Sequence, residues 1–79
     1  MNKSVDGAVV DMTPVEAKTL AAIGYIAERR DLALEFTRGP VLVYHEVPEN
    51  IFTALLGADM PDDYFEKNIR YAYKNKRVW

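Results

Sequence analysis

Few residues in this sequence could carry chemistry, and they are scattered along the chain. His45 is the only histidine and cysteine is absent, so a thiolate nucleophile and a cysteine-based zinc site are both excluded. His45 stands beside Glu46 on an expected strand, and nothing near it in the sequence pairs with it. We interpret His45 as a structural or exposed side chain, with a general base as the alternative.

Three carboxylates, Asp62, Asp63 and Glu66, could in principle group oxygen ligands for a hard cation. Their spacing does not match a calcium loop, and acidic residues at a helix start explain them better. The one serine, Ser4, lies in the first few residues, and the four glycines form no phosphate-binding or nucleophile motif. We therefore expect no catalytic residue, metal site or cofactor, and predict that the protein is not an enzyme.

Charge is segregated along the second half of the chain. From Gly39 to Glu66 there are six acids and no lysine or arginine, whereas Lys67 to Trp79 holds five bases and no acid. Such separation orients a domain toward a charged partner. The plainer alternative is a helix dipole complemented at both ends plus a solvated tail. We predict that the acidic side contacts a protein, through Glu46, Glu49, Asp59, Asp62 and Asp63.

The basic end also carries aromatic rings. Tyr71, Tyr73 and Trp79 lie among the bases, a combination that suits single-stranded RNA and equally a protein interface. Tyr73 fits a core position better, whereas Trp79 could close the fold or bind a partner. We predict nucleic-acid or protein contacts through Lys67, Arg70, Tyr71, Lys74, Lys76, Arg77 and Trp79.

Overall composition limits the classes of protein. The 79 residues are 49% hydrophobic and 28% charged, which predicts one folded domain over 1–79, with 1–19 a less certain extension. A net charge of −2 and a pI near 5.3 argue against non-specific duplex binding. No apolar run approaches the length of a membrane span, and no secretory leader is evident, so we expect a cytoplasmic protein.

The residues that carry charge must be positioned by a small set of elements. A short strand is expected over 8–12, followed by a helix or turn to about Lys18, because Thr13, Pro14 and Glu16 have helix-start spacing. The pattern predicts strands over residues 20–26, 32–37 and 41–46. Apolar and polar residues alternate most regularly over 32–37.

A helical period then follows over about 49–57 and again from about 59–63 onward. Ile51, Phe52, Leu55 and Leu56 are expected inward on the first helix; on the second we expect Tyr64, Phe65, Ile69 and Ala72 or Tyr73. The predicted fold is α+β, a three-stranded antiparallel meander packed against two C-terminal helices.

From about Ala22 to Tyr73 the chain resembles the KTSC domain, a short module found alone in bacteria and phages and appended to some lysyl-tRNA synthetases. The resemblance rests on a set of ungapped pieces: Ile23-Gly24-Tyr25, Val43-Tyr44 with Val47-Pro48, Leu55-Leu56 with Ala58-Asp59, and Tyr64-Phe65 with Ile69-Arg70 and Tyr73.

The chain departs from the family pattern at several positions. Leu42 replaces the first member of a Tyr-x-Tyr pair and leaves Tyr44 alone. Met60-Pro61-Asp62 replaces a Ser-x-Gly, and Glu66 replaces an asparagine. These acidic changes weaken, for this member, the RNA-binding role that has been suggested for the family.

The single-domain form is similar to small phage regulators that bind bacterial RNA polymerase. That resemblance implies a non-enzymatic regulator that docks on the host transcription machinery and inhibits initiation or promotes antitermination. The alternative is an RNA-binding accessory domain. In either case we expect a monomer without a small-molecule substrate.

Overall fold

The computed structural model describes residues 2–5 and 8–78, which form two antiparallel sheets and two helices. The main sheet has five strands whose spatial order follows the chain. They are β3 (Thr13–Pro14), β4 (Leu20–Ile26), β5 (Asp31–Phe36), β6 (Val41–Tyr44) and β7 (Asn75–Arg77). A separate hairpin pairs β1 (Asn2–Val5) with β2 (Ala8–Asp11).

Short turns join the three central strands. Gly39 has a φ of 113°, a conformation that glycine adopts without steric cost, and it closes the β5–β6 turn. On the β4–β5 side the last turn residue, Arg30, has a φ of 55°. The resulting register sets Ile23 opposite Leu34 and Leu34 opposite Leu42. Facing residues therefore share one side of the sheet.

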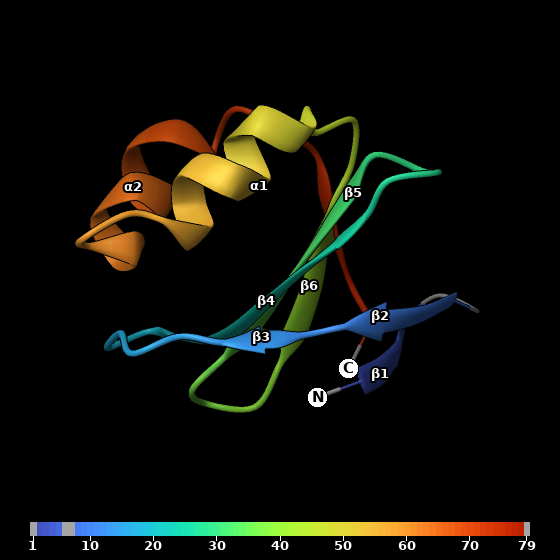
Figure 1. The fold of residues 1–79 in the computed structure, drawn as a ribbon, viewed down its shortest axis with the longest axis horizontal. Coiled ribbons are helices and arrows are strands. Elements are labelled where there is room, and N and C mark those ends of the chain that lie inside the picture. Colours follow the sequence, from blue (N-terminus) through green and yellow to red (C-terminus); the bar gives the residue numbers. More distant parts are fainter. Residues whose placement is uncertain (1, 6–7, 79) are drawn as a thin grey trace.

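Helices α1 (Glu49–Leu56) and α2 (Pro61–Asn68) cover that side, as Figure 1 shows. Tyr25 helps to hold α1, because its hydroxyl donates to the Val47 carbonyl at 2.6 Å and its ring stacks on Phe52 at 5.3 Å between centroids. The buried residues of this layer are Leu20, Ile23, Leu32, Leu34, Tyr44, Val47, Leu55, Phe65 and Ile69.

The opposite side of the sheet is buried as well. A second apolar cluster there comprises Val10, Met12, Ala22, Ala33, Val41 and Val43. The chain from β2 into β3 crosses this side, and Gly24 of β4 allows the approach. A Cβ at position 24 would lie 2.6 Å from the Met12 sulfur and 2.6 Å from a Val10 methyl group. A small domain thus obtains two apolar layers from one sheet.

The predicted α+β class is correct, but the predicted number of strands was too low. The strand expected over 8–12 is β2, and the three meander strands are β4, β5 and β6. Strand β6 ends at Tyr44, earlier than the expected Glu46, because the chain bends at residues 45–46 and Glu46 has a φ of 56°. Both predicted helices are present.

The helix expected after Thr13 is wrong. Thr13 and Pro14 pair with Ile23 and Ala22 of β4, and the Val15 amide donates to the Ala21 carbonyl at 3.0 Å. Pairing with a distant strand therefore overrides the local capping signal.

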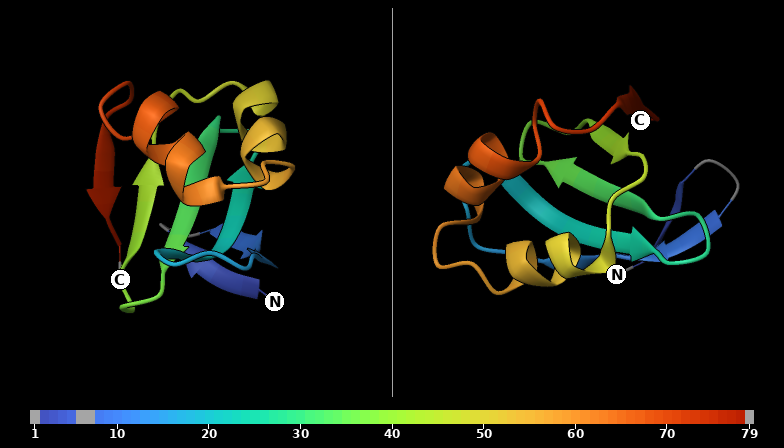
Figure 2. Two further views of the ribbon diagram at one scale, coloured as in Figure 1. Left: turned by 90° about the vertical axis from the view of Figure 1, so that its left-hand side faces the viewer. Right: turned by 90° about the horizontal axis from the view of Figure 1, so that it is seen from above.

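The predicted extent of the second helix was also wrong. Helix α2 ends at Asn68, and the amides of Ile69 and Arg70 both donate to the Phe65 carbonyl. Phe65 and Ile69 are buried as expected; of the two alternatives beyond them, Ala72 is exposed, whereas Tyr73 is half-buried and packs against the core. The basic segment that follows is an edge strand, β7, visible beside β6 in Figure 2. No helix among the described residues is long and apolar enough to cross a membrane.

Candidate functional site

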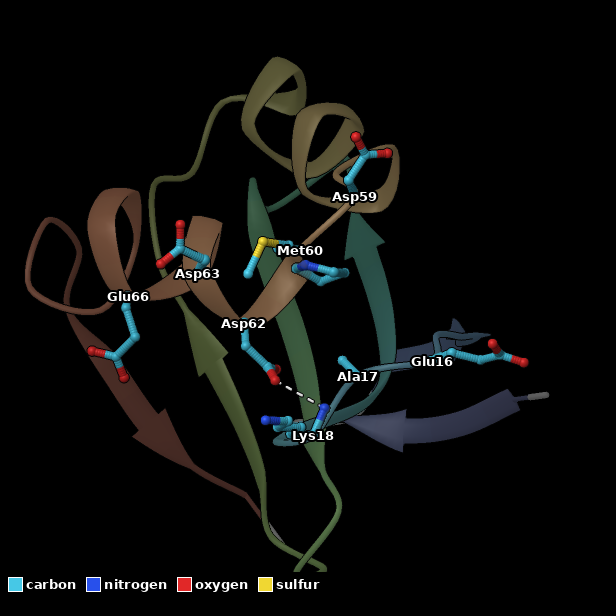
Figure 3. Close-up of a pocket in the computed structure, with 9 residues that line it drawn as sticks. Glu16, Ala17, Lys18, Asp59, Met60, Asp62, Asp63 and Glu66 are labelled. Carbon is cyan, nitrogen blue, oxygen red and sulfur yellow. Dashed lines mark hydrogen bonds between the residues drawn. The ribbon is translucent and has the colours of Figure 1, made fainter.

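The predicted acidic residues occupy two separate places. Glu46 and Glu49 are exposed at the corner between β6 and α1, whereas Asp59, Asp62 and Asp63 lie at the turn into α2 and its first residues. The structure therefore does not bring the five carboxylates together. The group at α2 borders a hollow of about 390 Å³, which Figure 3 shows.

Asp62 has a structural partner within the chain. Its carboxylate accepts hydrogen bonds from the backbone amides of Lys18 at 2.8 Å, Thr19 at 3.1 Å and Leu20 at 3.2 Å. These amides lie just before and at the first residue of β4, so Asp62 holds the start of α2 against the sheet (Figure 3). Charge-assisted bonds to several amides hold a carboxylate firmly, so Asp62 is less available to a partner than its neighbours.

The exposed part of this hollow combines negative charge with an apolar side chain. Met60 has 67% of its surface exposed, so its side chain is accessible to a partner. Asp59, Asp63 and Glu66 lie on the helical side, and Glu16 projects from the β3–β4 connection (Figure 3). We call these five residues the Met60 surface. Glu16 and Met60 were not among the predicted site residues, because sequence order separates Glu16 from α2 and exposure of Met60 has no local signal.

Ion pairs along α2 reduce the charge separation seen in the sequence. Lys67 lies 3.1 Å from Asp63, and Arg70 donates to Glu66 at 2.6 Å, both four residues apart. The hydrogen bond to Glu66 raises the pKa of the Arg70 guanidinium above its ordinary value. Exposed helical pairs of this kind are screened by solvent and contribute little to stability. Glu16 and Asp59 lie outside these two pairs, and the carboxylates of the hollow outnumber Lys18, the one base in its lining.

A second hollow of about 460 Å³ lies between α2 and the sheet. Phe36 and Tyr44 both meet the Phe65 ring edge-on, with centroids 5.7 Å apart, and Leu42 lies on the same wall. Burial raises the pKa of the Tyr44 hydroxyl, and the nearby Arg70 charge opposes the shift.

Four more residues border this hollow: Thr19, Glu66, Arg70 and Asn75. Tyr71, whose surface is 83% exposed, completes the lining, and the Arg70 guanidinium lies 5.2 Å from its ring centroid. We call the whole lining the aromatic groove. Leu42 and Tyr44, the two positions of the Tyr-x-Tyr pattern, both line it.

The remaining predicted basic residues lie beyond α2. Lys74 precedes β7 and lines a third hollow, of about 510 Å³, with His45, Glu46, Ala72 and Tyr73. Lys76 and Arg77 are exposed on β7. Trp79 lies outside the described residues. Of the predicted basic and aromatic residues that the structure describes, Arg70 and Tyr71 line one hollow together, and Lys74 lines another.

His45 has a partner that sequence proximity could not reveal. Its Nδ1 lies 3.0 Å from a carboxylate oxygen of Asp31, which is only 6% exposed, at the start of β5. The pair satisfies a buried carboxylate and joins the ends of two neighbouring strands, which favours the structural interpretation of His45. Among the described residues no group of three or more potential metal ligands occurs.

Comparisons with known proteins place the chain among relatives. A family model described as the KTSC domain matches residues 16–73. A curated protein of Tsukamurella paurometabola is 44% identical over 48 residues, which cover 61% of this chain and 72% of that protein. The crystal structure of a KTSC domain protein from Yersinia pestis superposes with a TM-score of 0.83 at 22% identity, covering 89% of this chain and 99% of that one, and this shows a shared fold. The family match extends over most of the chain, including the three central strands β4, β5 and β6 and both helices, and on this ground the chain belongs to the KTSC domain family.

Proposed function

We propose that this protein is a small non-enzymatic regulator that docks on a basic protein surface of the bacterial transcription machinery, with RNA polymerase the first candidate. The observation that carries the proposal is the Met60 surface. A side chain that is 67% exposed, beside a hollow lined mainly by carboxylates, supplies the apolar contact and the charged rim that a protein interface combines.

The charge of this surface favours a protein partner over a nucleic acid. Carboxylates of Glu16, Asp59 and Asp63 would repel a phosphate backbone but attract lysines and arginines. Met60 offers a flexible, polarisable side chain, which adapts well to apolar pockets on a partner. Proteins that handle nucleic acids present basic surfaces of the complementary kind. RNA polymerase is such a protein, and the similarity to small phage regulators supports the choice.

The first experiment is capture of purified RNA polymerase by immobilised protein in the presence of nuclease. We expect retention of the polymerase, and at least about a tenfold loss of affinity when Met60→Ser is combined with Asp59→Lys. The matched control is Glu28→Lys, an exposed residue of the β4–β5 turn, which adds a positive charge away from the Met60 surface. Equal loss in the control, or no retention of polymerase by the unmodified protein, contradicts the proposal.

The regulatory part of the proposal has its own readout. Bound protein should change the yield of transcripts from a defined promoter, or read-through at a terminator, in a purified transcription reaction. The Met60→Ser, Asp59→Lys variant should lose this effect in proportion to its loss of binding. Binding without any change in transcript yield or read-through would mean that the protein docks without regulating.

RNA binding remains a second candidate because of Arg70 and Tyr71. An exposed ring with a guanidinium 5.2 Å from its centroid is a combination that stacks on unpaired bases. If RNA is the partner, Arg70→Ala with Lys74→Ala should abolish a measured shift of single-stranded RNA, and affinity should fall steeply with salt. An unchanged shift in the double variant removes this candidate.

A further inference from the structure

Tyr44 gives the aromatic groove a hydroxyl that has no hydrogen-bond partner among the described residues. Only 3% of the Tyr44 surface is exposed, but its hydroxyl oxygen is not one of the fully buried unsatisfied atoms and so keeps accessible surface in the groove. Arg70 and Glu66, which act electrostatically on the Tyr44 phenol, both line the groove. The hydroxyl end of the side chain therefore faces the charged rim and is available to a ligand.

The walls of the groove favour a ring as the occupant. Phe36 and Tyr44 already contact the Phe65 ring edge-on, and Tyr71 leaves most of its ring uncovered at the rim. Rings add to such clusters in edge or offset geometry, with a gain beyond that of area alone. A volume of about 460 Å³ falls in the range of small-ligand pockets and is ample for a phenol or an indole.

The charges of the groove favour a neutral occupant. Arg70 is the only cation among the residues that line the groove, and Glu66 already compensates it at 2.6 Å. An anionic ligand would have to share the Arg70 guanidinium with the Glu66 carboxylate. A cationic ligand would have to compete with Arg70 for that carboxylate. A neutral ring with one polar atom needs neither, because Tyr44 and Asn75 offer hydrogen-bonding groups without charge.

We propose that the aromatic groove binds a tyrosine or tryptophan side chain presented by a partner protein. Glu66 lines both the groove and the hollow of the Met60 surface, so the two adjoin at this residue of α2. A partner that contacts Met60 can therefore insert an aromatic anchor beside it, which is how buried aromatic residues dominate many interfaces. This inference takes the protein nature of the occupant from the proposed function, but the groove itself can be tested without any polymerase.

The test is NMR titration of the labelled protein with the neutral probes N-acetyl-tyrosinamide and N-acetyl-tryptophanamide. We expect saturable shifts at Tyr44, Phe65 and Tyr71, with dissociation constants on the order of millimolar, because the probes are small. Tyr44→Phe removes only the hydroxyl and should weaken the tyrosinamide roughly three- to tenfold. Tyr71→Ala should weaken both probes. Tyr64 lies on α2 but outside the groove lining, so Tyr64→Phe should change the affinity for neither probe.

Two further probes decide what the groove recognises. N-acetyl-leucinamide should bind at least several-fold more weakly, and uridine monophosphate should not displace the aromatic probes. Equal binding of leucinamide, tighter binding of the nucleotide, or no groove shifts at about 10 mM aromatic probe would each overturn the inference. Loss of polymerase capture with intact probe binding would count against the proposed function alone, whereas capture with no probe binding would count against the groove alone.

Discussion

At the scale of single residues, Gly24 decides whether the N-terminal segment can lie against the sheet. Adding one methyl group there places a Cβ 2.6 Å from the Met12 sulfur and 3.2 Å from the Asp11 carbonyl oxygen. Because the second contact is with backbone, side-chain rotation cannot relieve all of it. We predict that Gly24→Ala lowers the free energy of unfolding by about 1–3 kcal/mol, measured by urea denaturation.

Gly57 supplies the matched control for this substitution. It follows α1 with a φ of −91°, and an added Cβ would meet nothing closer than the Thr53 carbonyl at 3.5 Å. Gly57→Ala should leave the free energy of unfolding within about 1 kcal/mol of the original or raise it slightly. If the two variants lose equal stability, the close contact of Met12 and Asp11 with position 24 is not the reason that glycine is needed there.

Asp62 is the acidic residue whose role the structure makes most specific. Asp62→Ala leaves the amides of Lys18, Thr19 and Leu20 without their acceptor, so we predict a loss of about 1–3 kcal/mol in the free energy of unfolding. Asp63→Ala, which removes only an exposed pair with Lys67, should cost at most about 0.5 kcal/mol. Thermal and urea unfolding of the two variants would show the difference, and similar losses would contradict the anchoring role.

The Tyr44 hydroxyl predicts how stability depends on pH. Burial raises its pKa above the ordinary value of 10.0, against the opposing charge of Arg70, so the folded state retains a proton that the unfolded chain releases. The contribution is therefore complete below about pH 10 and is lost as pH rises through the pKa of the folded state. Between pH 9 and pH 11 the original protein should lose more stability than Tyr44→Phe in urea unfolding. Equal losses would show that Tyr44 ionises as easily in the folded state as in the unfolded chain.

At the scale of elements, β7 shows how a sheet edge recruits a polar segment. The His45 amide donates to the Lys74 carbonyl, the Val78 amide donates to the Val41 carbonyl, and Lys76 lies opposite Val43 between these two bonds. Antiparallel ladders alternate, so the Lys76 amide points at β6. We predict that Lys76→Pro costs about 1–3 kcal/mol and that Lys76→Ala, which keeps the amide, costs markedly less. Amide exchange and urea unfolding can measure the stability of both variants. Equal losses would show that the Lys76 amide does not bond to β6.

The same elements explain which parts of the fold the sequence could reveal. Alternation of Leu32, Leu34 and Phe36 identifies β5 because large apolar residues on the helix-covered face alternate with Ala33 and Glu35 on the other face. Strands β3 and β7 leave none, since their residues are exposed and their pairing depends on distant partners. Thr13 and Pro14 even carry a helix-start signal, which pairing with β4 overrides.

The candidate site divides in the same way. Asp59 and Asp63 were predictable because acids cluster near a helix start. The approach of Glu16 to Met60, and of Tyr44 to Arg70 and Tyr71, depends on how α2 lies on the sheet, and no local spacing encodes it.

At the scale of the whole molecule, the net charge of −2 is distributed so that pairs on α2 cancel while Glu16 and Asp59 remain beside Met60. Such a field acts mainly on the rate of encounter, because charges outside the contact centre steer a partner before they touch it. We therefore predict that association with RNA polymerase slows at least several-fold between about 50 and 200 mM salt, while dissociation changes little.

Variants of equal charge separate steering by the Met60 surface from the effect of net charge. Glu16→Gln with Asp59→Asn removes two negative charges beside Met60, and Glu28→Gln with Glu49→Gln removes two elsewhere. The first variant should associate more slowly and lose most of the salt dependence, measured by surface plasmon resonance, whereas the second should keep both. That result would identify the Met60 surface as the docking surface, because charges that guide association lie around the surface that makes the contact. If the two variants slow equally, only the overall charge of the molecule matters and the partner approaches another face.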